Sequence, residues 1–301
     1  MVDEIKTLWK EARELSIGSQ IERLDFPPSP LRFLRDFVSP NKPCIISNAI
    51  SHWPALSLWP TRSYLSETMS DSEVSVHLTP HGRADFLVND ASNSTVFASA
   101  YVDRVPFNRA LDLVLNSGIS SVAYLQQQND CFRQEYGALT SDCDEHFPWA
   151  TEAFGSMPEA VNLWIGNSFS TTSFHKDHYE NLYAVVSGEK HFLLLPPCDV
   201  HRLYIQQYPA ANYAYSHEDA NFSLTIEDPP KYVPWSSVDP YPSPENRERE
   251  MSKHPLYFNG PEPLNCTVKA GEILYLPSLW FHHVQQSPDE HGRTIAVNYC
   301  E

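Results

Sequence analysis

Residues Thr171 to Pro197 read TTSFHKDHYENLYAVVSGEKHFLLLPP, and the expected fold is built outward from this stretch. Apolar and partly β-branched residues fill positions 182–186, and a second apolar run fills 191–195. Between the two runs, Ser187-Gly188-Glu189 is typical of a tight turn. Two apolar runs of strand length around a short turn that contains glycine predict a β-hairpin.

A His-x-Asp pair precedes the expected hairpin. His175 and Asp177 lie two residues apart, and in an extended strand such side chains project from the same face. A third ligand is expected from GEILYLPSLWFHHV, where an apolar run carries His282 and His283. Adjacent strand residues face opposite ways, so only one of these two histidines can join, and the spacing does not choose between them. Two histidines and one carboxylate form the facial arrangement of non-haem Fe(II) oxygenases.

Lys190 distinguishes this pair from an isolated His-x-Asp, which occurs by chance in many proteins. It follows the turn of the expected hairpin. A cation near an iron site suits the distal carboxylate of 2-oxoglutarate, because that co-substrate needs an ion pair at one end and metal chelation at the other. The two features together predict a 2-oxoglutarate oxygenase.

The composition limits the function classes. The chain has 301 residues, 42% of them hydrophobic, which is enough to bury one substantial core. Lys and Arg number 21 against 38 Asp and Glu, giving a net charge of -17. This charge repels nucleic acid, so no direct binding to DNA or RNA is expected, whereas a cationic protein substrate would be attracted. The simpler explanation of the negative net charge is that it keeps the protein soluble.

Neither the cysteines nor the N-terminus indicates a secreted or membrane protein. The six cysteines lack Cys-x-x-Cys spacing, so neither a zinc site nor a disulfide framework is expected. Residues 2–16 are acidic and amphipathic, with no apolar signal region, and no later run is long enough to span a bilayer. A soluble intracellular protein without a membrane partner is expected, in the cytoplasm, the nucleus or both.

Other patterns predict the remaining elements. An N-terminal helix that packs on the rest of the fold is expected from apolar residues at helical spacing: Ile5, Leu8, Trp9, Ala12 and Leu15. Strands are expected at 43–47, 73–78, 121–126 and in four segments after residue 266, and a helix at 108–115. Residues 92–103 are polar and resemble a loop. Trp235, between two prolines, indicates that the proline-rich stretch 228–265 is docked on the fold.

Several segments together are similar to the small hydroxylase branch of the JmjC-domain 2-oxoglutarate oxygenases. Between about Pro27 and Asn298 they are KPCIISNAISHWPAL, AVNLWIG, HKDHYENLY, SGEKHFL, VPWSSVDP and AGEILYLPSLWFHHVQQS. The resemblance implies a mainly β fold, the double-stranded β-helix or cupin-like jelly roll, with a helical N-terminal flank. It implies an N-terminal helix within 1–26 and a catalytic domain over 27–301, with the barrel core at about 121–301 and an insertion at about 228–265.

The resemblance also implies the ligands of the metal. It assigns Fe(II) to His175, Asp177 and His282, and leaves His283 as a packing residue or one that supports the ligands. O2 would take the last open position on the iron.

For the co-substrate, the resemblance assigns the distal carboxylate of 2-oxoglutarate to Lys190, Tyr124 and Thr172. Asn181 and Asn298 would line the same pocket. The alternative for Tyr124 is an ordinary core aromatic with a bonded hydroxyl, and a buried asparagine amide requires hydrogen-bond partners whether or not it lines a pocket.

The substrate follows from the resemblance alone. It implies hydroxylation of a target lysine at C3 in the developmentally regulated GTP-binding proteins, which are linked to translation. A lysine side chain requires carboxylates or aromatic faces near the iron, and Asp85 in HGRADF is a candidate. A homodimer is in doubt, because the C-terminal helical segment that contributes to dimers in the family does not follow Cys300-Glu301.

Three other functions remain open. Lysine or arginine demethylation in histones would use the same three ligands and release formaldehyde. A metal-dependent endopeptidase on histone tails would hold zinc and activate water, although no His-Glu-x-x-His motif occurs. A non-catalytic cupin scaffold would have no reason to keep the three ligands together with Lys190.

Overall fold

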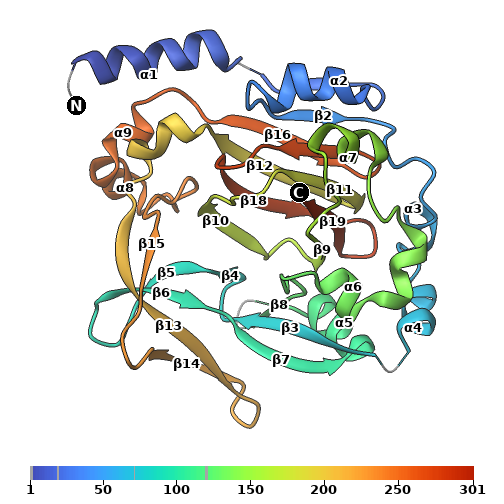
Figure 1. Ribbon diagram of the computed structural model, residues 1–301. Coiled ribbons are helices and arrows are strands. Elements are labelled where there is room, and N and C mark those ends of the chain that lie inside the picture. The colour runs from blue at the N-terminus through green and yellow to red at the C-terminus, as the bar shows by residue number, and fades with distance from the viewer. Residues whose placement is uncertain (1–2, 19, 71, 119–120) are drawn as a thin grey trace.

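Two facing β-sheets form the centre of the computed structural model, which describes residues 3–18, 20–70, 72–118 and 121–301 (Figure 1). The six-stranded sheet contains, in spatial order, β1 (Glu22–Leu24), β2 (Cys44–Ile46), β17 (Ile273–Leu276), β11 (Asn181–Ser187), β19 (Thr294–Cys300) and β9 (Ala160–Gly166). The five-stranded sheet contains β16 (Leu264–Lys269), β12 (Glu189–Leu195), β18 (Phe281–Ser287), β10 (Thr171–His175) and β4 (Arg83–Ala84).

Successive strands of the chain alternate between these two sheets. β9 and β11 lie in the first sheet, while β10 and β12 lie in the second. The same alternation returns in the C-terminal part, from β16 in the second sheet to β19 in the first. This is the strand order of a double-stranded β-helix, and it confirms the expected mainly β, cupin-like fold with a helical N-terminal flank.

The expected hairpin around Gly188 is wrong, although both of its strands form. β11 pairs with β17 and β19, whereas β12 pairs with β16 and β18. The apolar runs predict two buried strands but do not specify their partners, and each strand is enclosed by neighbours from the C-terminal part. Gly188 has φ +71° and forms a corner between the sheets.

The core has two main compartments, one on each side of the six-stranded sheet. All residues of β11 are buried, so this strand is covered on both faces. Leu182, Ala184 and Val186 contribute to the larger cluster, which includes residues of the helices that cover the outer face. Tyr183 and Val185 point the other way and pack between the two sheets.

Helices cover the outside of this barrel. Near the N-terminal half of the chain they are α2 (Pro30–Phe33) with the π-helical turn η1 (Leu34–Val38), α3 (Ala55–Leu58), α4 (Arg62–Met69), α5 (Phe107–Leu115), α6 (Cys131–Glu135), η2 (Gly137–Asp142) and α7 (Pro148–Phe154). The predicted helix at 108–115 is confirmed as α5, and the predicted strand at 43–47 as β2.

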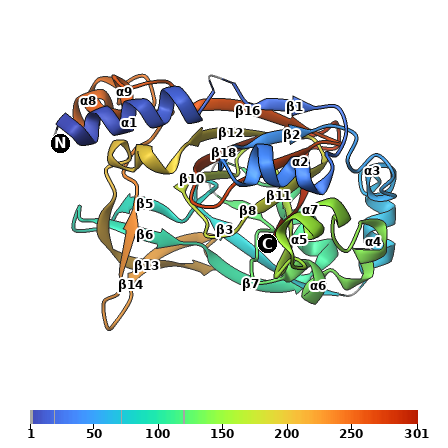
Figure 2. The ribbon, with the colours of Figure 1, turned by 45° about the horizontal axis from the view of Figure 1, so that its top comes forward.

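The N-terminal helix α1 (Asp3–Ser16) forms as predicted and lies on the outside of the molecule near α8 (Arg247–Lys253) and α9 (Pro255–Phe258) (Figure 2). Its Trp9 indole N–H donates to Asp199, 2.8 Å away, in the 3-10 turn η3 (Pro197–Arg202). Ile5 and Leu8 remain 54% and 66% exposed, so only part of the apolar stripe packs on the fold. The side chain of Leu15 lies outside the described part of the structure.

Two smaller sheets extend the barrel. The first contains β14 (Asn221–Ile226), β13 (Gln206–Ser216), β6 (Thr95–Ser99) and β5 (Phe86–Asn89), with β15 (Tyr232–Trp235) on β13. The second contains β7 (Tyr101–Pro106), β3 (Glu73–Thr79) and β8 (Val122–Tyr124). Figures 1 and 2 show the β13–β14 hairpin projecting away from the barrel.

The expectation of a loop at 92–103 is wrong, because β6 and part of β7 lie there. Val96, Phe97 and Ala98 are buried between β5 and β13. β13 lies far away in the sequence, so the local polarity of the segment gave no sign of this pairing. The polar residues at the start of the segment instead make the turn before β6, where Asn93 has φ +63°.

The proline-rich stretch 228–265 is docked, as Trp235 indicated. It contains β15, α8 (Arg247–Lys253) and α9 (Pro255–Phe258). The Trp235 ring lies 4.7 Å from that of Phe97, and its indole N–H donates to the Ser173 hydroxyl at 2.9 Å. The insertion therefore contacts strand β10 beside the expected metal ligands.

All six cysteines are free thiols, as the absence of a disulfide pattern predicted. Within the residues that the structure describes, no helix is long and apolar enough to cross a bilayer.

Candidate metal centre

The two expected histidine ligands lie opposite each other on neighbouring strands. His175 is the last residue of β10, and it pairs directly with His282 of β18. Their ring centroids are 4.0 Å apart. Strand alternation turns His283 to the other side of β18, where it packs against Phe174 and Tyr241. The structure thus brings His282, and not His283, toward His175.

Asp177 reaches the same point by a different route from the one expected. β10 ends at His175, so Asp177 lies in the following turn and not on an extended strand. Its carboxylate oxygens nevertheless lie 4.0 Å from Nε2 of His175 and 3.7 Å from Nε2 of His282. One ligand atom from each residue lies within 4.8 Å of the others, which is a spacing suited to one metal ion.

Backbone carbonyls orient both imidazole rings. Nδ1 of His175 lies 2.9 Å from the carbonyl oxygen of Ser173, and Nδ1 of His282 lies 3.1 Å from that of Trp280. Each Nδ1–H donates to its carbonyl, so each Nε2 lone pair faces the shared point. Metal-binding histidines commonly have such a second hydrogen bond, which sets the tautomer and the ring angle.

The surroundings shift the pKa of two of the three groups. Burial, reinforced by the nearby His175, lowers the pKa of His282 to about 4. Burial alone would raise the pKa of Asp177, but the charges of His175, His282 and His178 outweigh it and lower the pKa. With the Asp177 carboxylate and the imidazoles of His175 and His282, the site contains the donor set of non-haem Fe(II) sites.

A cavity of about 420 Å³ opens beside the three ligands. Its size suits a small organic acid together with part of a substrate side chain. The structure brings most of the sequence-predicted site residues to its wall, namely Tyr124, Thr172, His175, Asp177, Asn181, His282 and Asn298.

Lys190 is not part of this wall but lies behind Tyr124, which is. It is 1% exposed, and its ammonium donates to the Tyr124 hydroxyl at 2.9 Å. The ammonium also lies 5.3 Å and 5.9 Å from the ring centres of Tyr124 and Tyr183. Burial lowers the pKa of Lys190 to about 7, and no carboxylate of the described residues forms an ion pair with it. A buried cation without a counter-charge fits the anionic end of a ligand.

The two asparagines of the wall bond to each other. Asn298 Nδ2 donates to Asn181 Oδ1 at 3.2 Å, and the Trp164 indole N–H donates to Asn298 Oδ1 at 2.7 Å. Trp164 was not predicted from the sequence, because nothing in AVNLWIG distinguishes this indole from a core residue. The interlocked amides give the cavity an ordered polar side.

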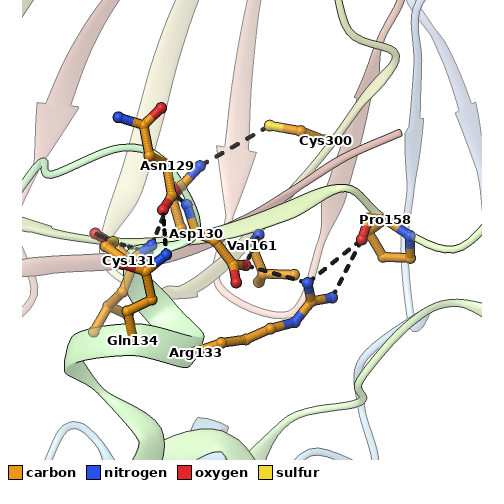
Figure 3. A network of polar contacts seen from close by, with 10 residues as sticks. Asn129, Asp130, Cys131, Arg133, Gln134, Pro158, Val161 and Cys300 are labelled. Carbon is orange, nitrogen blue, oxygen red and sulfur yellow. Dashed lines mark hydrogen bonds and ion pairs between the residues drawn. The ribbon is translucent and has the colours of Figure 1, made fainter.

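A network of polar contacts fixes the loop that carries Asn129 and Asp130 (Figure 3). Asn129 lines the cavity, and it and Asp130 both adopt left-handed backbone angles, φ +64° and +68°. The Asp130 carboxylate accepts from the Val161 backbone N–H at 2.8 Å and from Arg133 at 3.2 Å, and Arg133 also donates to the Pro158 carbonyl at 3.4 Å. The Asn-Asp pair signals a left-handed turn, but nothing in the sequence places that turn beside the metal ligands.

Asp85, the candidate for substrate contact, also lines the cavity. It lies between β4 and β5 with φ +52°. Burial raises the pKa of its carboxyl group, while the charges of His175 and His77 and a hydrogen bond with Ser99 oppose that shift.

Comparison with known proteins agrees with the fold. The cupin-like domain family matches residues 30–300. An Arabidopsis thaliana protein named lysine-specific demethylase JMJ32 is 62% identical over 99% of this chain and 86% of its own length. A human protein named bifunctional peptidase and (3S)-lysyl hydroxylase JMJD7 is 43% identical, over 98% of this chain and 88% of its own. JmjC domain-containing protein E of Dictyostelium discoideum is 37% identical, over 99% and 88%. The chain therefore belongs to the cupin-like JmjC family of oxygenases.

Proposed function

We propose that this protein is an Fe(II)- and 2-oxoglutarate-dependent oxygenase that hydroxylates a lysine side chain of a protein substrate, at C3. The observation that carries the proposal is Lys190, a buried amine without a carboxylate partner in the described chain, bonded to the hydroxyl of Tyr124 in the wall of the cavity that holds His175, Asp177 and His282. A dicarboxylate that chelates a metal at one end and meets a cation at the other suits both features.

Each part of the cavity has a task in this proposal. His175, Asp177 and His282 hold Fe(II) and leave its other positions open. Lys190 and the Tyr124 hydroxyl bind the distal carboxylate, and three further residues bound the co-substrate pocket: Thr172, Asn181 and Asn298. Bound iron and 2-oxoglutarate supply the activation of O2, which gives one oxygen atom to the substrate and one to succinate as CO2 is released.

Lysine demethylation is the second candidate, because the Arabidopsis relative that is 62% identical is named a lysine-specific demethylase. The human relative, 43% identical, is named both a peptidase and a lysyl hydroxylase. The cavity wall supports an oxygenase over a peptidase, because its described carboxylates are Asp85 and the ligand Asp177, with no glutamate available to activate a water. A scaffold without catalysis would gain nothing from a buried, unpaired Lys190.

The partner proposed is a protein with a target lysine, and a translation-associated GTP-binding protein is the first to test. The proposed place of action is the cytoplasm or the nucleus, and the proposal requires neither nucleic acid nor membrane for substrate binding. The acidic chain, with its net charge of -17, supports a cationic substrate segment.

The test is to incubate iron-loaded protein with 2-oxoglutarate and lysine peptides from these GTP-binding proteins, in unmethylated and trimethylated form. Peptide mass, succinate and formaldehyde are measured together. A gain of one oxygen on the unmethylated lysine, coupled to succinate, is expected. His175→Ala should abolish both products, whereas His217→Ala, which changes an exposed histidine outside the cavity, should keep them.

The other results separate the alternatives. Formaldehyde from the trimethylated peptide alone would favour the demethylase, and peptide fragments without succinate would favour the peptidase. An active His175→Ala protein would refute the assignment of the metal ligands.

A further inference from the structure

We propose that Asp85 binds the ammonium group of the substrate side chain and so selects a primary alkylammonium for the metal site. This inference rests on the proposed function, because it concerns the same cavity. It adds to that function the residue that recognises the charge of the substrate.

Asp85 is the one carboxylate of the described cavity wall that is available to a substrate. The wall contains two carboxylates, Asp85 and Asp177. Asp177 lies with His175 and His282 in the group that suits a metal ion. A substrate cation that enters the cavity therefore has Asp85 as its counter-charge.

The backbone fixes Asp85 beside the strand that carries His175. β4 pairs with β10 through Ala84 and Thr172, the residue pair next to Asp85. The carbonyl oxygen of Asp85 accepts a hydrogen bond from the Ser173 hydroxyl at 2.7 Å. The left-handed angle at Asp85, φ +52°, breaks the strand direction between β4 and β5 at this point. A side chain held in this way meets its ligand with little loss of conformational freedom.

No cation of the described residues neutralises Asp85, because none forms an ion pair with it. Arg83, two residues earlier, instead lies 3.3 Å from Asp239. Burial lowers the pKa of His77, which is therefore neutral at pH 7. The Lys176 ammonium lies over an aromatic ring of β18, 5.4 Å from its centre. A partly buried carboxylate without a counter-charge is costly, and a ligand cation would offset that cost.

Aromatic faces next to Asp85 suit the alkyl part of such a ligand. Phe97 and Trp235 both line the cavity with ring centroids 4.7 Å apart, and Trp235 stacks on His175 at an interplanar angle of 12°. The Ser173 hydroxyl accepts from the Trp235 indole and donates to the carbonyl of Asp85, so one hydroxyl joins both sides of the subsite. A carboxylate beside aromatic faces recognises a cation on a flexible apolar stem.

The test uses a small probe and no turnover. Protein loaded with Mn(II) is mixed with n-butylamine, which is cationic at neutral pH, or with n-butanol, its neutral analogue. Mn(II) in the metal site accelerates the proton relaxation of any molecule that exchanges through the cavity. We expect faster relaxation of butylammonium than of butanol, and we expect Asp85→Asn to weaken butylammonium binding by about ten- to a hundredfold.

Asp85→Asn keeps the size of the side chain and tolerates the left-handed angle, so its fold is expected to survive. Asp103→Asn is the matched control, because it removes the same charge from β7, where Asp103 lies 3.4 Å from His217 and does not line the cavity. The Asp103→Asn protein should accelerate the proton relaxation of butylammonium as much as the unchanged protein does. A loss of relaxation in both variants would indicate attraction by the net charge alone and would overturn the inference.

Two outcomes separate this inference from the proposed function. Equal relaxation of butylammonium and butanol, with Mn(II) bound in a His175-dependent way, would show that Asp85 does not select cations and would leave the oxygenase proposal standing. If His175→Ala bound Mn(II) as tightly as the unchanged protein, the assignment of the metal site would be refuted, and this inference would be refuted with it. On a lysine peptide that the protein hydroxylates, Asp85→Asn should raise KM more than it lowers kcat.

Discussion

No charged side chain in the described part of the chain pairs with Lys190, so its burial is costly to the fold and favours an anionic ligand. Replacing Lys190 with methionine removes a buried ammonium and keeps a side chain of similar length. We predict that Lys190→Met raises the free energy of unfolding of the ligand-free protein by roughly 1–4 kcal/mol, while it weakens 2-oxoglutarate binding at least about a hundredfold. Urea unfolding and calorimetric titration measure the two effects. Lys269→Met, at an exposed position of β16, should change neither.

The pKa of the same residue predicts a pH dependence. Burial lowers the pKa of Lys190 from 10.5 to about 7, so in the free protein this amine loses its proton as the pH rises through about 7. An anionic ligand requires the ammonium, so binding above pH 7 must take up a proton, and the affinity for 2-oxoglutarate should fall as the pH rises. Calorimetric titration at pH 8 in two buffers of different ionisation enthalpy measures the uptake. Equal heats in both buffers would contradict this prediction.

The pKa of Lys190 affects the stability of the ligand-free protein in the opposite direction: affinity for 2-oxoglutarate falls with pH, but the free energy of unfolding rises. Between about pH 7 and 10.5 the unfolded chain carries a proton on this amine that the folded protein lacks. The contribution of Lys190 to the free energy of unfolding therefore rises with pH across this window.

Single residues of the site could be predicted when a short motif carried them, and not otherwise. The His-x-Asp spacing indicated His175 and Asp177, although Asp177 lies beyond the strand end. Spacing alone could not choose between His282 and His283; the family resemblance made that choice, and the pairing of β18 with β10 brings His282 opposite His175. Trp164 and the loop around Asn129 could not be predicted, because their roles depend on contacts between segments far apart in the chain.

Among the elements, strands were predictable and their pairing was not. The apolar runs of β11 and β12 predicted both strands, but each pairs with strands from after residue 263. The strands β6 and β7 were missed altogether, because β13 buries part of β6 from a distance that no local window covers. Periodicity reports which face of a segment is buried, whereas the identity of the neighbour is a property of the whole topology.

The turn at Gly188, between β11 and β12, yields a prediction about stability. Gly188 has φ +71°, and an added Cβ would lie 2.6 Å from the Ser287 carbonyl oxygen. Gly155 has a similar φ of +78°, but open space surrounds its Cβ position. We predict that Gly188→Ala lowers the free energy of unfolding by about 2–4 kcal/mol, and Gly155→Ala by about 1–2 kcal/mol. Urea unfolding of both proteins measures the difference, and equal losses would mean that the corner relaxes without cost.

On the scale of the whole molecule, Asp199 joins the N-terminal helix to the barrel. Its carboxylate is fully buried and accepts from Trp9 at 2.8 Å, from Arg13, and from Arg202 at 2.5 Å. Arg202 is 1% exposed, so removal of the carboxylate leaves a buried guanidinium without its charged partner. The anchor therefore serves the barrel as well as α1.

We predict that Asp199→Ala lowers the free energy of unfolding by about 3–5 kcal/mol, because it leaves the buried Arg202 guanidinium without its carboxylate partner. Trp9→Phe removes only one hydrogen bond of the anchor and should cost about 1 kcal/mol. Hydrogen exchange should then show faster exchange in α1 alone for Trp9→Phe and in η3 as well for Asp199→Ala. Identical exchange patterns would show that the helix and the barrel are not joined through this carboxylate.

The pairing of β10 with β18 also sets an order of events during protein synthesis. A ribosome releases His175 and Asp177 long before His282, because β11 to β17 are made in between. The emerging chain therefore carries an incomplete chelator through most of its synthesis. In the metal site proposed above, tight capture would have to wait for β18, and the bound ion would then join the late strands of the chain to the early ones.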